Sequence, residues 1–502
     1  MRNCSFLKAN LHLILIPLVV VTLHILTNNQ YGFHRDELDL LMNARQLDWG
    51  YVAYPPLSPF LARIGLELFG SSLRGLRVFP ALAQGIVVLL TMLMARDFDA
   101  KRPGQIVAGL SAGIAPVAMV AGTLLQYMSF DYFWWVVVAF FLVRLIKTTD
   151  PRWWLGIGAG IGLGMMTKFT MVFWAAGVVV AALATPLRRY LRSRWLWLGA
   201  ALALLIYLPN LIWQIQHNFI SLDFLAAIHA RDIAWGRTEG FLTDQLYATT
   251  YPTTLPLWVI GLFFCLFSNN GKTYRPLAYL FLTTFFLLLV SRGRGYYLAP
   301  AYAMLLAAGS ARWEYWLAQR SVRPFSPGWQ ATWITLSISF VTAVVIMKPV
   351  VPINSTLWPI TSDINDNVVE MIGWQELTAQ IAQIYADIPQ LEKPKTVILA
   401  GNYGEAGALD LYGTEYDLPP VISGSNSLWQ RGYGNFEPES VIVVGFERQY
   451  ADHFFKVCKQ VGTVSNQYSV RNEESSFHTS LFICHQPRQS WEVLWANMQW
   501  FQ

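Results

Sequence analysis

Charged residues are scarce in this sequence: they make up 13% of its 502 residues, whereas 54% of the residues are hydrophobic. Soluble globular domains carry roughly 25% charged residues. Together with 21 Trp and a positive mean hydropathy, this shortage excludes an ordinary soluble chain. The net charge of +5 lies in short clusters between apolar runs and forms no basic stripe interleaved with aromatics, so nucleic acid is not an expected partner. We predict an integral membrane protein.

Motifs for metals and nucleotides are missing as well. The sequence has no CxxC pair, no HExxH and no zinc-spaced His cluster, so a structural zinc site is not expected. The glycine-rich stretch 401–413 is compatible with a phosphate at a helix N-terminus, but it has neither GxGxxG nor GxxxxGKS, which argues against nucleotide binding. Two of the four cysteines, Cys458 and Cys484, are compatible both with a disulfide and with two free thiols.

Long apolar runs, in contrast, are abundant. A membrane-spanning helix needs ~20 mostly apolar residues, and we expect about eleven such helices. They are predicted near residues 11–27, 78–95, 105–125, 132–146, 153–167, 169–186, 195–213, 253–268, 276–291, 296–310 and 329–347. The first run is interpreted as a retained helix, because no small-x-small cleavage site follows it.

The basic residues predict how these helices are oriented. Starting from Arg2 and Lys8, every second connection is rich in Lys and Arg, which is typical of the cytoplasmic side. The N-terminus is therefore predicted inside, and everything after Lys348 outside. The other predicted outer segments are 28–77, 126–131, the turn near Lys168, 214–252 and 291–295.

The composition changes near Pro349, which divides the chain into two expected domains. Residues 1–348 are predicted to form a transmembrane domain with the outer loop 28–77, and residues 349–502 an outer domain of ordinary size. In the second domain, strands are expected at 396–400 and 440–445 and helices at 373–388 and 405–412. This alternation predicts an α/β sandwich.

The outer segment 31–60 concentrates ionisable groups in a chain that has few of them. It contains, in order, His34, Arg35, Asp36, Glu37, Asp39 and the corner formed by Tyr54, Pro55 and Pro56. One interpretation is an active-site loop at a membrane surface. The alternative is a solvated amphipathic helix whose acids favour its N-terminus. Asp39, one turn after the first acids, is expected to be a solvated surface residue.

Further ionisable residues fall on the same outer side. Asp131 opens the fourth span, either as a site residue or as the N-cap of the helix. Lys168 is either a snorkelling lysine or a phosphate contact. Arg292 and Arg294 lie where the orientation rule disfavours arginine, and an anionic partner would explain them.

Acids and cations on one face of a membrane suit the transfer of a sugar from a phosphate carrier. A carboxylate deprotonates the acceptor hydroxyl and the cations stabilise the departing phosphate. The alternative is a transporter or flippase of a lipid-linked or anionic substrate, because charged groups in a bundle also serve transport. A non-catalytic envelope assembly protein is a third possibility.

Several short motifs carry a resemblance that covers about residues 28–310. They are Asp36-Glu37, the corner from Tyr54 to Leu57, Asp131, the Lys168-x-Thr170 turn and the turn from Arg294 to Pro300. Their order resembles the polytopic glycosyltransferases of family 39, which have the GT-C fold and include protein O-mannosyltransferases and the lipid A aminoarabinose transferase. The stretches 402–413 and 421–429 look like the tail of uncharacterised bacterial members, which implies kinship and no activity.

The resemblance implies an inverting transferase that uses a polyprenyl-phosphate-linked sugar at the outer face of a bacterial inner membrane. It assigns Asp36 as base or metal ligand, with Glu37 and Asp131 assisting. The implied substrate-binding residues are His34, Tyr54, Pro55, Pro56, Lys168, Arg292, Arg294, Tyr296 and Tyr297. A divalent cation, Mg or Mn, at Asp36 and Asp131 is the cofactor to be tested. Tyr54 departs from the Lys or His that relatives often have, and the acceptor is a protein, lipid or glycan not specified by the sequence.

Overall fold

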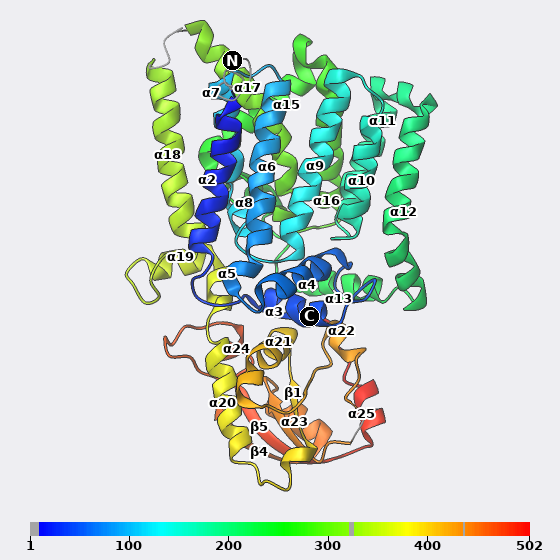
Figure 1. The fold of residues 1–502 in the computed structure, drawn as a ribbon, viewed down its shortest axis with the longest axis vertical. Coiled ribbons are helices and arrows are strands. Elements are labelled where there is room, and N and C mark those ends of the chain that lie inside the picture. Colours follow the sequence, from blue (N-terminus) through cyan, green and yellow to red (C-terminus); the bar gives the residue numbers. More distant parts are fainter. Residues whose placement is uncertain (1–9, 321–325, 435–436) are drawn as a thin grey trace.

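A bundle of long helices occupies one end of the molecule and a small α/β domain the other, with a layer of short helices between them (Figure 1). The computed structural model describes residues 10–320, 326–434 and 437–502. Helix α2 (His12–Thr27) begins at the far end of the bundle, away from the α/β domain (Figure 1).

Each apolar run of the sequence contains a helix. The bundle helices are α2 (His12–Thr27), α6 (Val78–Asp97), α7 (Arg102–Gly113), α8 (Pro116–Ala121), α9 (Tyr127–Thr148), α10 (Trp153–Met165), α11 (Met171–Ala184), α12 (Arg194–Gln216), α15 (Leu255–Phe267), α16 (Arg275–Val290), α17 (Tyr302–Arg320) and α18 (Pro327–Met347). The run at 105–125 is broken into α7 and α8. The run at 296–310 begins with the 3-10 helix η4 (Gly295–Ala301), so its α-helix starts later than predicted.

Fewer helices than predicted meet the length and composition of a full span. Among the described residues, five helical segments are long and apolar enough to cross a membrane, or up to seven if two bent pairs each form one span. The helices α2 and α10 are apolar but shorter. The chain is thus a multi-pass membrane protein, and the count of eleven stays a prediction.

Glycines allow neighbouring bundle helices to touch along their backbones. A Cβ at Gly158 of α10 would lie 2.0 Å from the carbonyl oxygen of Gly199 on α12, and one at Gly309 of α17 would lie 1.7 Å from that of Leu257 on α15. Small residues at helix contacts are typical of membrane bundles, where close packing replaces the hydrophobic effect between helices.

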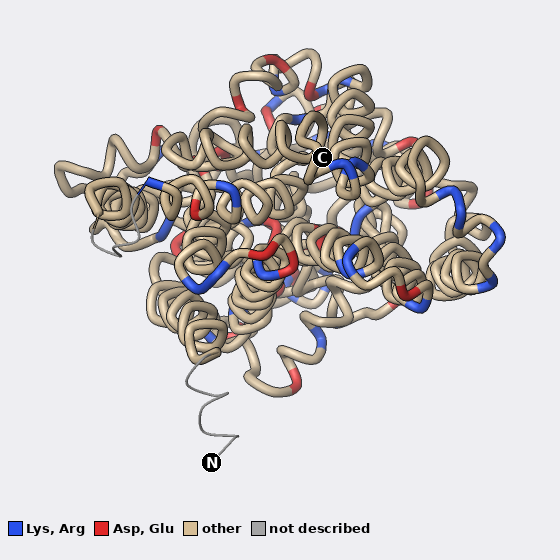
Figure 2. The backbone as a smooth tube through the Cα atoms, turned by 90° about the horizontal axis from the view of Figure 1, so that it is seen from above, with Lys and Arg blue, Asp and Glu red and all other residues tan. Residues whose placement is uncertain are grey.

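The basic connections meet at the bundle end where α2 begins. Arg144 Nη1 lies 2.8 Å from Asp97 Oδ1, and Arg312 Nη2 donates to the Phe98 carbonyl at 2.9 Å. Seen from this end, Lys and Arg segments occur at several helix ends (Figure 2). These contacts show which connections share an end, while the cytoplasmic assignment of that end stays a prediction.

The loops that are predicted to lie outside the membrane form the middle layer. Its helices are α3 (Arg35–Arg45), α4 (Leu57–Phe69), α5 (Leu73–Leu76), α13 (Ile220–Ala234) and α14 (Phe241–Tyr247). Helix α3 is rich in charge, yet Leu38, Leu41 and Ala44 are fully buried because the α/β domain covers the side of α3 that faces away from the bundle. This layer brings the first outer loop between the two domains (Figure 1).

The C-terminal domain is built on a mixed five-stranded sheet with helices on both faces, which agrees with the predicted α/β sandwich. Its strands are β1 (Thr396–Ala400), β2 (Val421–Ile422), β3 (Ser440–Val444), β4 (Phe455–Thr463) and β5 (Ser480–Pro487), in the order β2-β1-β3-β5-β4. Strand β1 pairs in parallel with β2 and β3, whereas β5 is antiparallel to both β3 and β4. The surrounding helices are α19 (Trp358–Ile364), α20 (Trp374–Ala386), α21 (Tyr403–Tyr412), α22 (Asn426–Trp429), α23 (Arg448–Phe454), α24 (Glu473–Ser476) and α25 (Trp491–Ala496).

Side chains of the two central strands point alternately to two apolar layers. Ile398 and Ile442 join the layer that contains α20, α21 and α3, while Val397 and Val443 pack against residues of α23 and α25. Because a strand alternates sides at every residue, a strand buried on both faces is apolar throughout. This explains why β1 and β3 were recognisable in the sequence.

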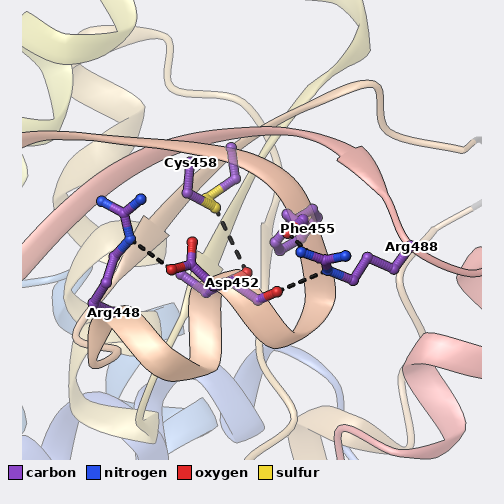
Figure 3. Close-up of a disulfide and its surroundings, with 7 residues drawn as sticks. Arg448, Asp452, Phe455, Cys458 and Arg488 are labelled. Carbon is purple, nitrogen blue, oxygen red and sulfur yellow. Dashed lines mark hydrogen bonds and ion pairs between the residues drawn. A yellow bond between two sulfur atoms is a disulfide. The ribbon is translucent and has the colours of Figure 1, made fainter.

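Cys458 and Cys484 form a disulfide between the paired strands β4 and β5 (Figure 3). Beside it, Arg488 Nε donates to the carbonyls of Asp452 at 2.8 Å and Phe455 at 3.2 Å. The sequence left the disulfide and the free thiols open, and the structure contains the disulfide. It fixes the edge strand β4 to the sheet.

Candidate active site

Helix α3 begins with a capping box made by the first outer loop. His34 Nδ1 accepts the Asp36 backbone N–H at 3.1 Å, and Glu37 Oε2 accepts that of His34 at 2.8 Å. Gln126 Nε2 lies 3.1 Å from the same ring nitrogen of His34. Burial is the main cause that lowers the pKa of His34, so the ring acts as a neutral acceptor. The imidazole of His34 thereby fixes the start of the helix.

Glu37 is fully buried and every acceptor position of its carboxylate is used. Oε1 accepts from Arg77 Nε at 2.9 Å and from the Leu125 N–H at 2.7 Å, and Oε2 accepts from Arg77 Nη2 at 2.6 Å and from the His34 N–H. Two carboxylate oxygens offer about four lone-pair positions. Glu37 therefore ties α3 to the bundle and has no acceptor position left for a substrate.

Among Asp36, Glu37 and Asp39, the acids of α3, Asp36 is the one that stays accessible, with 27% of its side chain exposed. The Tyr403 hydroxyl, from the C-terminal domain, donates to Asp36 Oδ1 at 2.9 Å. Oδ2 lies 3.9 Å from His34 Nδ1, which is too far for a hydrogen bond. One oxygen of Asp36 is thus held and the other can meet a ligand.

The prediction that Asp39 is a solvated surface acid is wrong. Asp39 is 5% exposed, because the C-terminal domain covers α3, and its Oδ2 accepts the Tyr54 hydroxyl. Burial raises the pKa of Asp39 to about 6. Asn43 Nδ2 donates to the Tyr54 oxygen at 2.6 Å, so the hydroxyl of Tyr54 is bonded within the protein.

The Tyr54 corner lies close to the bundle. The Tyr54 ring stacks on Tyr127 with ring centres 5.3 Å apart, and Pro55 and Pro56 are buried. The Leu57 N–H donates to the carbonyl of Met166 at 2.9 Å, which places the corner beside the turn that contains Lys168. The corner thereby joins the first outer loop to that turn.

Asp131 lies inside helix α9, which begins at Tyr127, so the interpretation as an N-cap is wrong. Its Oδ1 accepts from Trp135 Nε1 at 3.0 Å and its Oδ2 from the Thr170 hydroxyl at 2.8 Å. Lys168 is the cation that acts on this carboxylate. Asp131 therefore orients the Lys168-x-Thr170 turn.

The ammonium group of Lys168 sits among three tyrosine rings. Its Nζ lies 4.1 Å from the ring centre of Tyr297, 5.3 Å from that of Tyr127 and 5.8 Å from that of Tyr296. Such cation–π contacts are worth about 0.5–2 kcal/mol each. Three segments that the sequence singled out separately thus meet around one cation.

Arg294 is paired with an aspartate of the chain itself. Its Nε and Nη2 donate to Asp232 Oδ2 and Oδ1 at 2.7 and 2.6 Å. Arg231 Nη2 and Arg237 Nη1 lie 3.7 and 3.9 Å from the same carboxylate. Burial, together with Arg294 and Arg231, lowers the pKa of Arg237. Three arginines around one acid leave an excess of positive charge at this place.

Arg292 is not one of the three arginines that pair with Asp232. Its side chain is exposed, its backbone is left-handed with φ 50°, and it lines an open pocket of about 550 Å³ with Ile233, Phe241 and Leu289. The structure therefore separates two arginines that the sequence treated as a pair.

Several residues of this site were missed from the sequence. They are Tyr127, Arg231, Asp232, Arg237 and Tyr403. Arg231, Asp232 and Arg237 stand in the outer loop 214–252, whose surplus of arginine against the orientation rule was an available signal. Tyr403 stands in the glycine-rich stretch that was assigned no activity.

The cation predicted at Asp36 and Asp131 stays a prediction. Within residues 10–320, 326–434 and 437–502, no group of three or more His, Cys, Asp or Glu side chains is placed to hold a metal ion. The Asp131 oxygens accept from Trp135 and Thr170, and Asp36 Oδ1 accepts from Tyr403. No chemical step is therefore routed through a metal here.

The fold is that of a polytopic membrane protein similar to solved structures of ArnT. ArnT from Cupriavidus metallidurans in the apo state has a TM-score of 0.58 at 14% identity, covering 95% of this chain and 98% of that one. The same protein bound to undecaprenyl phosphate gives a TM-score of 0.55 at 16% identity with the same coverage. These likenesses concern the fold alone.

Sequence comparisons define the relationship further. Residues 53–213 match the family described as dolichyl-phosphate-mannose-protein mannosyltransferase. The lipid A galacturonosyltransferase RgtD of Rhizobium johnstonii is 28% identical over 208 residues, 40% of this chain and 41% of that protein. An undecaprenyl phosphate-α-4-amino-4-deoxy-L-arabinose arabinosyl transferase of Pseudomonas fluorescens is 33% identical over 171 residues, 32% of this chain and 30% of that protein.

The chain is thus related to the polytopic membrane glycosyltransferases, and the resemblance inferred from its motifs is confirmed. The matched regions span less than half the length of these curated relatives.

Proposed function

We propose that the protein is a membrane glycosyltransferase that moves a sugar from a polyprenyl-phosphate carrier to an acceptor at the outer end of the bundle. The observation that carries the proposal is the meeting of an accessible carboxylate and a cationic cluster around Tyr127. Lys168 lies over the Tyr127 ring, and Tyr127 interacts electrostatically with both Asp36 and Arg294. The names of the curated relatives support a polyprenyl-phosphate donor and a lipid acceptor.

Asp36 is the base of this reaction. Its carboxylate takes the proton of the acceptor hydroxyl as that oxygen attacks the anomeric carbon. The bond between this carbon and the phosphate oxygen breaks, and the carrier phosphate leaves with the electron pair. A single displacement with attack opposite the leaving group inverts the anomeric centre.

Lys168 and the arginine cluster stabilise the charge of the departing phosphate. Asp131 acts through the turn that it orients, and Glu37 acts through the helix start that it anchors, so both are positioning residues. Tyr54 contributes by packing on Tyr127 rather than by supplying its hydroxyl. A divalent cation at Asp36 and Asp131 remains the competing proposal, and turnover after chelator treatment separates the two.

The outer assignment rests on the basic connections at the opposite end and on the disulfide in the C-terminal domain. Disulfides persist in oxidising compartments such as the bacterial periplasm. The N-terminus is then cytoplasmic, and the domain of residues 349–502 lies outside.

The test is turnover in detergent, where no gradient exists to drive a transporter. Purified protein is mixed with polyprenyl-phosphate-linked sugars and a lipid acceptor, and release of the polyprenyl phosphate is measured. Asp36→Asn keeps the shape and removes the base, so we expect a loss of ~10²–10⁴ in rate.

Glu67→Gln is the matched control. Glu67 is an acid of the same layer that pairs with Arg63 and has 64% of its side chain exposed, so Glu67→Gln leaves turnover unchanged. Wild-type turnover by folded Asp36→Asn protein refutes the role of Asp36. Absence of any carrier consumption across the sugar panel favours the transporter.

A further inference from the structure

The proposed function gives the glycine-rich stretch 401–413 no role in the transfer, and the turn at its start is not an anion site. Asn402 caps α21 by accepting the Glu405 N–H at 2.8 Å. In return, Glu405 Oε2 accepts the N–H groups of Gly401 at 2.8 Å and Asn402 at 3.1 Å. The chain's own carboxylate thus occupies the helix start at which a phosphate would bind.

Two glycines of this stretch let α21 lie directly on the first turns of α3. A Cβ at Gly404 would come within 3.0 Å of the Arg35 Cβ, and one at Gly407 within 2.7 Å of the backbone C and O of Leu38. Only a residue without a side chain permits such an approach. The stretch is therefore shaped to dock on the helix that carries Asp36.

Charged pairs hold this contact at both ends. Arg35 forms an ion pair with Glu473 and lies 3.9 Å from Glu474. At the other end, Arg45 pairs with Asp410 of α21. All these acids belong to the C-terminal domain, and both arginines belong to the first outer loop. The ion pairs therefore hold α3 against the C-terminal domain.

Tyr403 is the first residue of α21, and its side chain extends from this helix contact to Asp36, the proposed base. The Arg35 guanidinium lies 5.0 Å from the centre of its ring, which fixes the ring, and its hydroxyl donates to Asp36 Oδ1 at 2.9 Å. The other ionisable groups that act on or touch the Asp36 carboxylate are His34, Asp39 and Tyr127.

We infer that Tyr403 is a positioning residue for Asp36 and that the C-terminal domain thereby completes the active site. The hydroxyl holds Oδ1 and stabilises the ionised carboxylate, so that Oδ2 faces the acceptor hydroxyl in the form that accepts a proton. This inference rests on the proposed function, since it assigns Tyr403 to the base named there.

Tyr403→Phe tests the inference, because it removes one oxygen and keeps the ring under Arg35. We expect kcat to fall about tenfold, which is the usual scale for one lost hydrogen bond to a charged group. The KM for the polyprenyl-phosphate sugar stays unchanged, since Tyr403 does not touch the carrier. The acid limb of the kcat/KM profile moves to higher pH, because a carboxylate without its donor is protonated more readily.

Tyr412→Phe is the matched control, since Tyr412 lies on the same helix and its hydroxyl bonds with Gln375 instead. It leaves kcat and the pH profile as in the wild type. Two outcomes overturn the inference while Asp36→Asn remains inactive: an unchanged kcat and pH profile for Tyr403→Phe, or a lower kcat with an unmoved acid limb and a lower thermal unfolding midpoint. If Asp36→Asn turns over normally, the proposed function fails first.

Discussion

Asp36, Glu37 and Asp39 lie within one turn of the same helix, and their surroundings give them three different roles. Glu37 uses all its acceptor positions within the fold, Asp39 is buried against Tyr54, and Asp36 keeps one oxygen accessible. Successive residues of a helix point about 100° apart, so neighbouring acids meet different partners. The sequence predicted Asp36 as the base, and this assignment stays a prediction. The sequence could not show how the three acids differ, because several of their partners come from distant segments.

Asp39→Asn is predicted to stabilise the protein at neutral pH. The pKa of Asp39 is raised from 3.8 to about 6, so the folded state favours the protonated form. Its contribution to stability is complete below pH ~4 and is lost as the pH rises through ~6, a change of up to about 3 kcal/mol. An asparagine copies the neutral form and does not titrate.

Thermal unfolding in detergent between pH 4 and 8 checks this prediction. The thermal unfolding midpoint of Asp39→Asn is higher than that of the wild type at pH 8 and equal to it near pH 4. Both proteins retain turnover. A wild-type midpoint that rises steadily from pH 5 to 8, together with no gain in the variant, contradicts it.

Arg294→Lys is predicted to weaken carrier binding by about tenfold, since lysine cannot form the paired hydrogen bonds of a guanidinium. Arg292→Lys has a smaller effect, because Arg292 is exposed and is not one of the arginines that pair with Asp232. Affinity for the carrier lipid in neutral detergent is the measurement.

Asp232→Asn tests whether Arg294 binds the carrier phosphate or only pairs with Asp232. It removes the internal anion that competes for Arg231, Arg237 and Arg294, so carrier affinity is retained or increased. If Arg294→Lys and Asp232→Asn lose carrier affinity to the same extent, the ion pair between Arg294 and Asp232 supports binding, and Arg294 does not contact the phosphate.

At the scale of elements, the long apolar runs predicted where helices lie, and the continuous apolar runs predicted β1 and β3. Strands β4 and β5 were not predicted, because β4 is an edge strand with mixed burial and lacks an apolar run. The contact between α3 and α21 could not be predicted from the sequence either, because neither segment has a pattern that indicates which helix it packs against. The wrong expectation for Asp39 follows from that missing contact.

Gly407→Ala is predicted to separate α21 from α3. The added methyl group meets the backbone of Leu38, which cannot move aside like a flexible side chain. Displacing Asp36 and Tyr403 by a fraction of an ångström or more costs up to about 10²-fold in turnover. Turnover and the thermal unfolding midpoint are measured together.

Gly462→Ala serves as the control for this change. Its added Cβ would lie 3.4 Å from the nearest atom, on the Leu481 side chain, at the edge of ordinary contact. Gly462→Ala keeps wild-type turnover, and a fully active Gly407→Ala protein shows that the close helix contact is dispensable.

At the scale of the whole molecule, the two ends of the bundle differ in a way that predicts the orientation. The basic connections gather at the end where α2 begins, and the C-terminal domain covers the other (Figures 1 and 2). A reporter active only outside the cytoplasm is therefore expected to work when fused after Lys348 and to fail when fused after Asp99. The opposite pattern reverses the orientation and with it the outer active site.

Asp36 and Tyr403 lie 367 residues apart in the chain, although their side chains share a hydrogen bond. A ribosome that adds about 5–20 residues per second needs roughly 20 to 70 seconds to make that interval. In the predicted orientation, the first outer loop is exported during this time, before the helix that will hold its carboxylate has been made. We therefore expect a chain truncated before α21 to turn over carrier-linked sugar more slowly than the full chain, because Asp36 lacks the hydrogen bond from Tyr403.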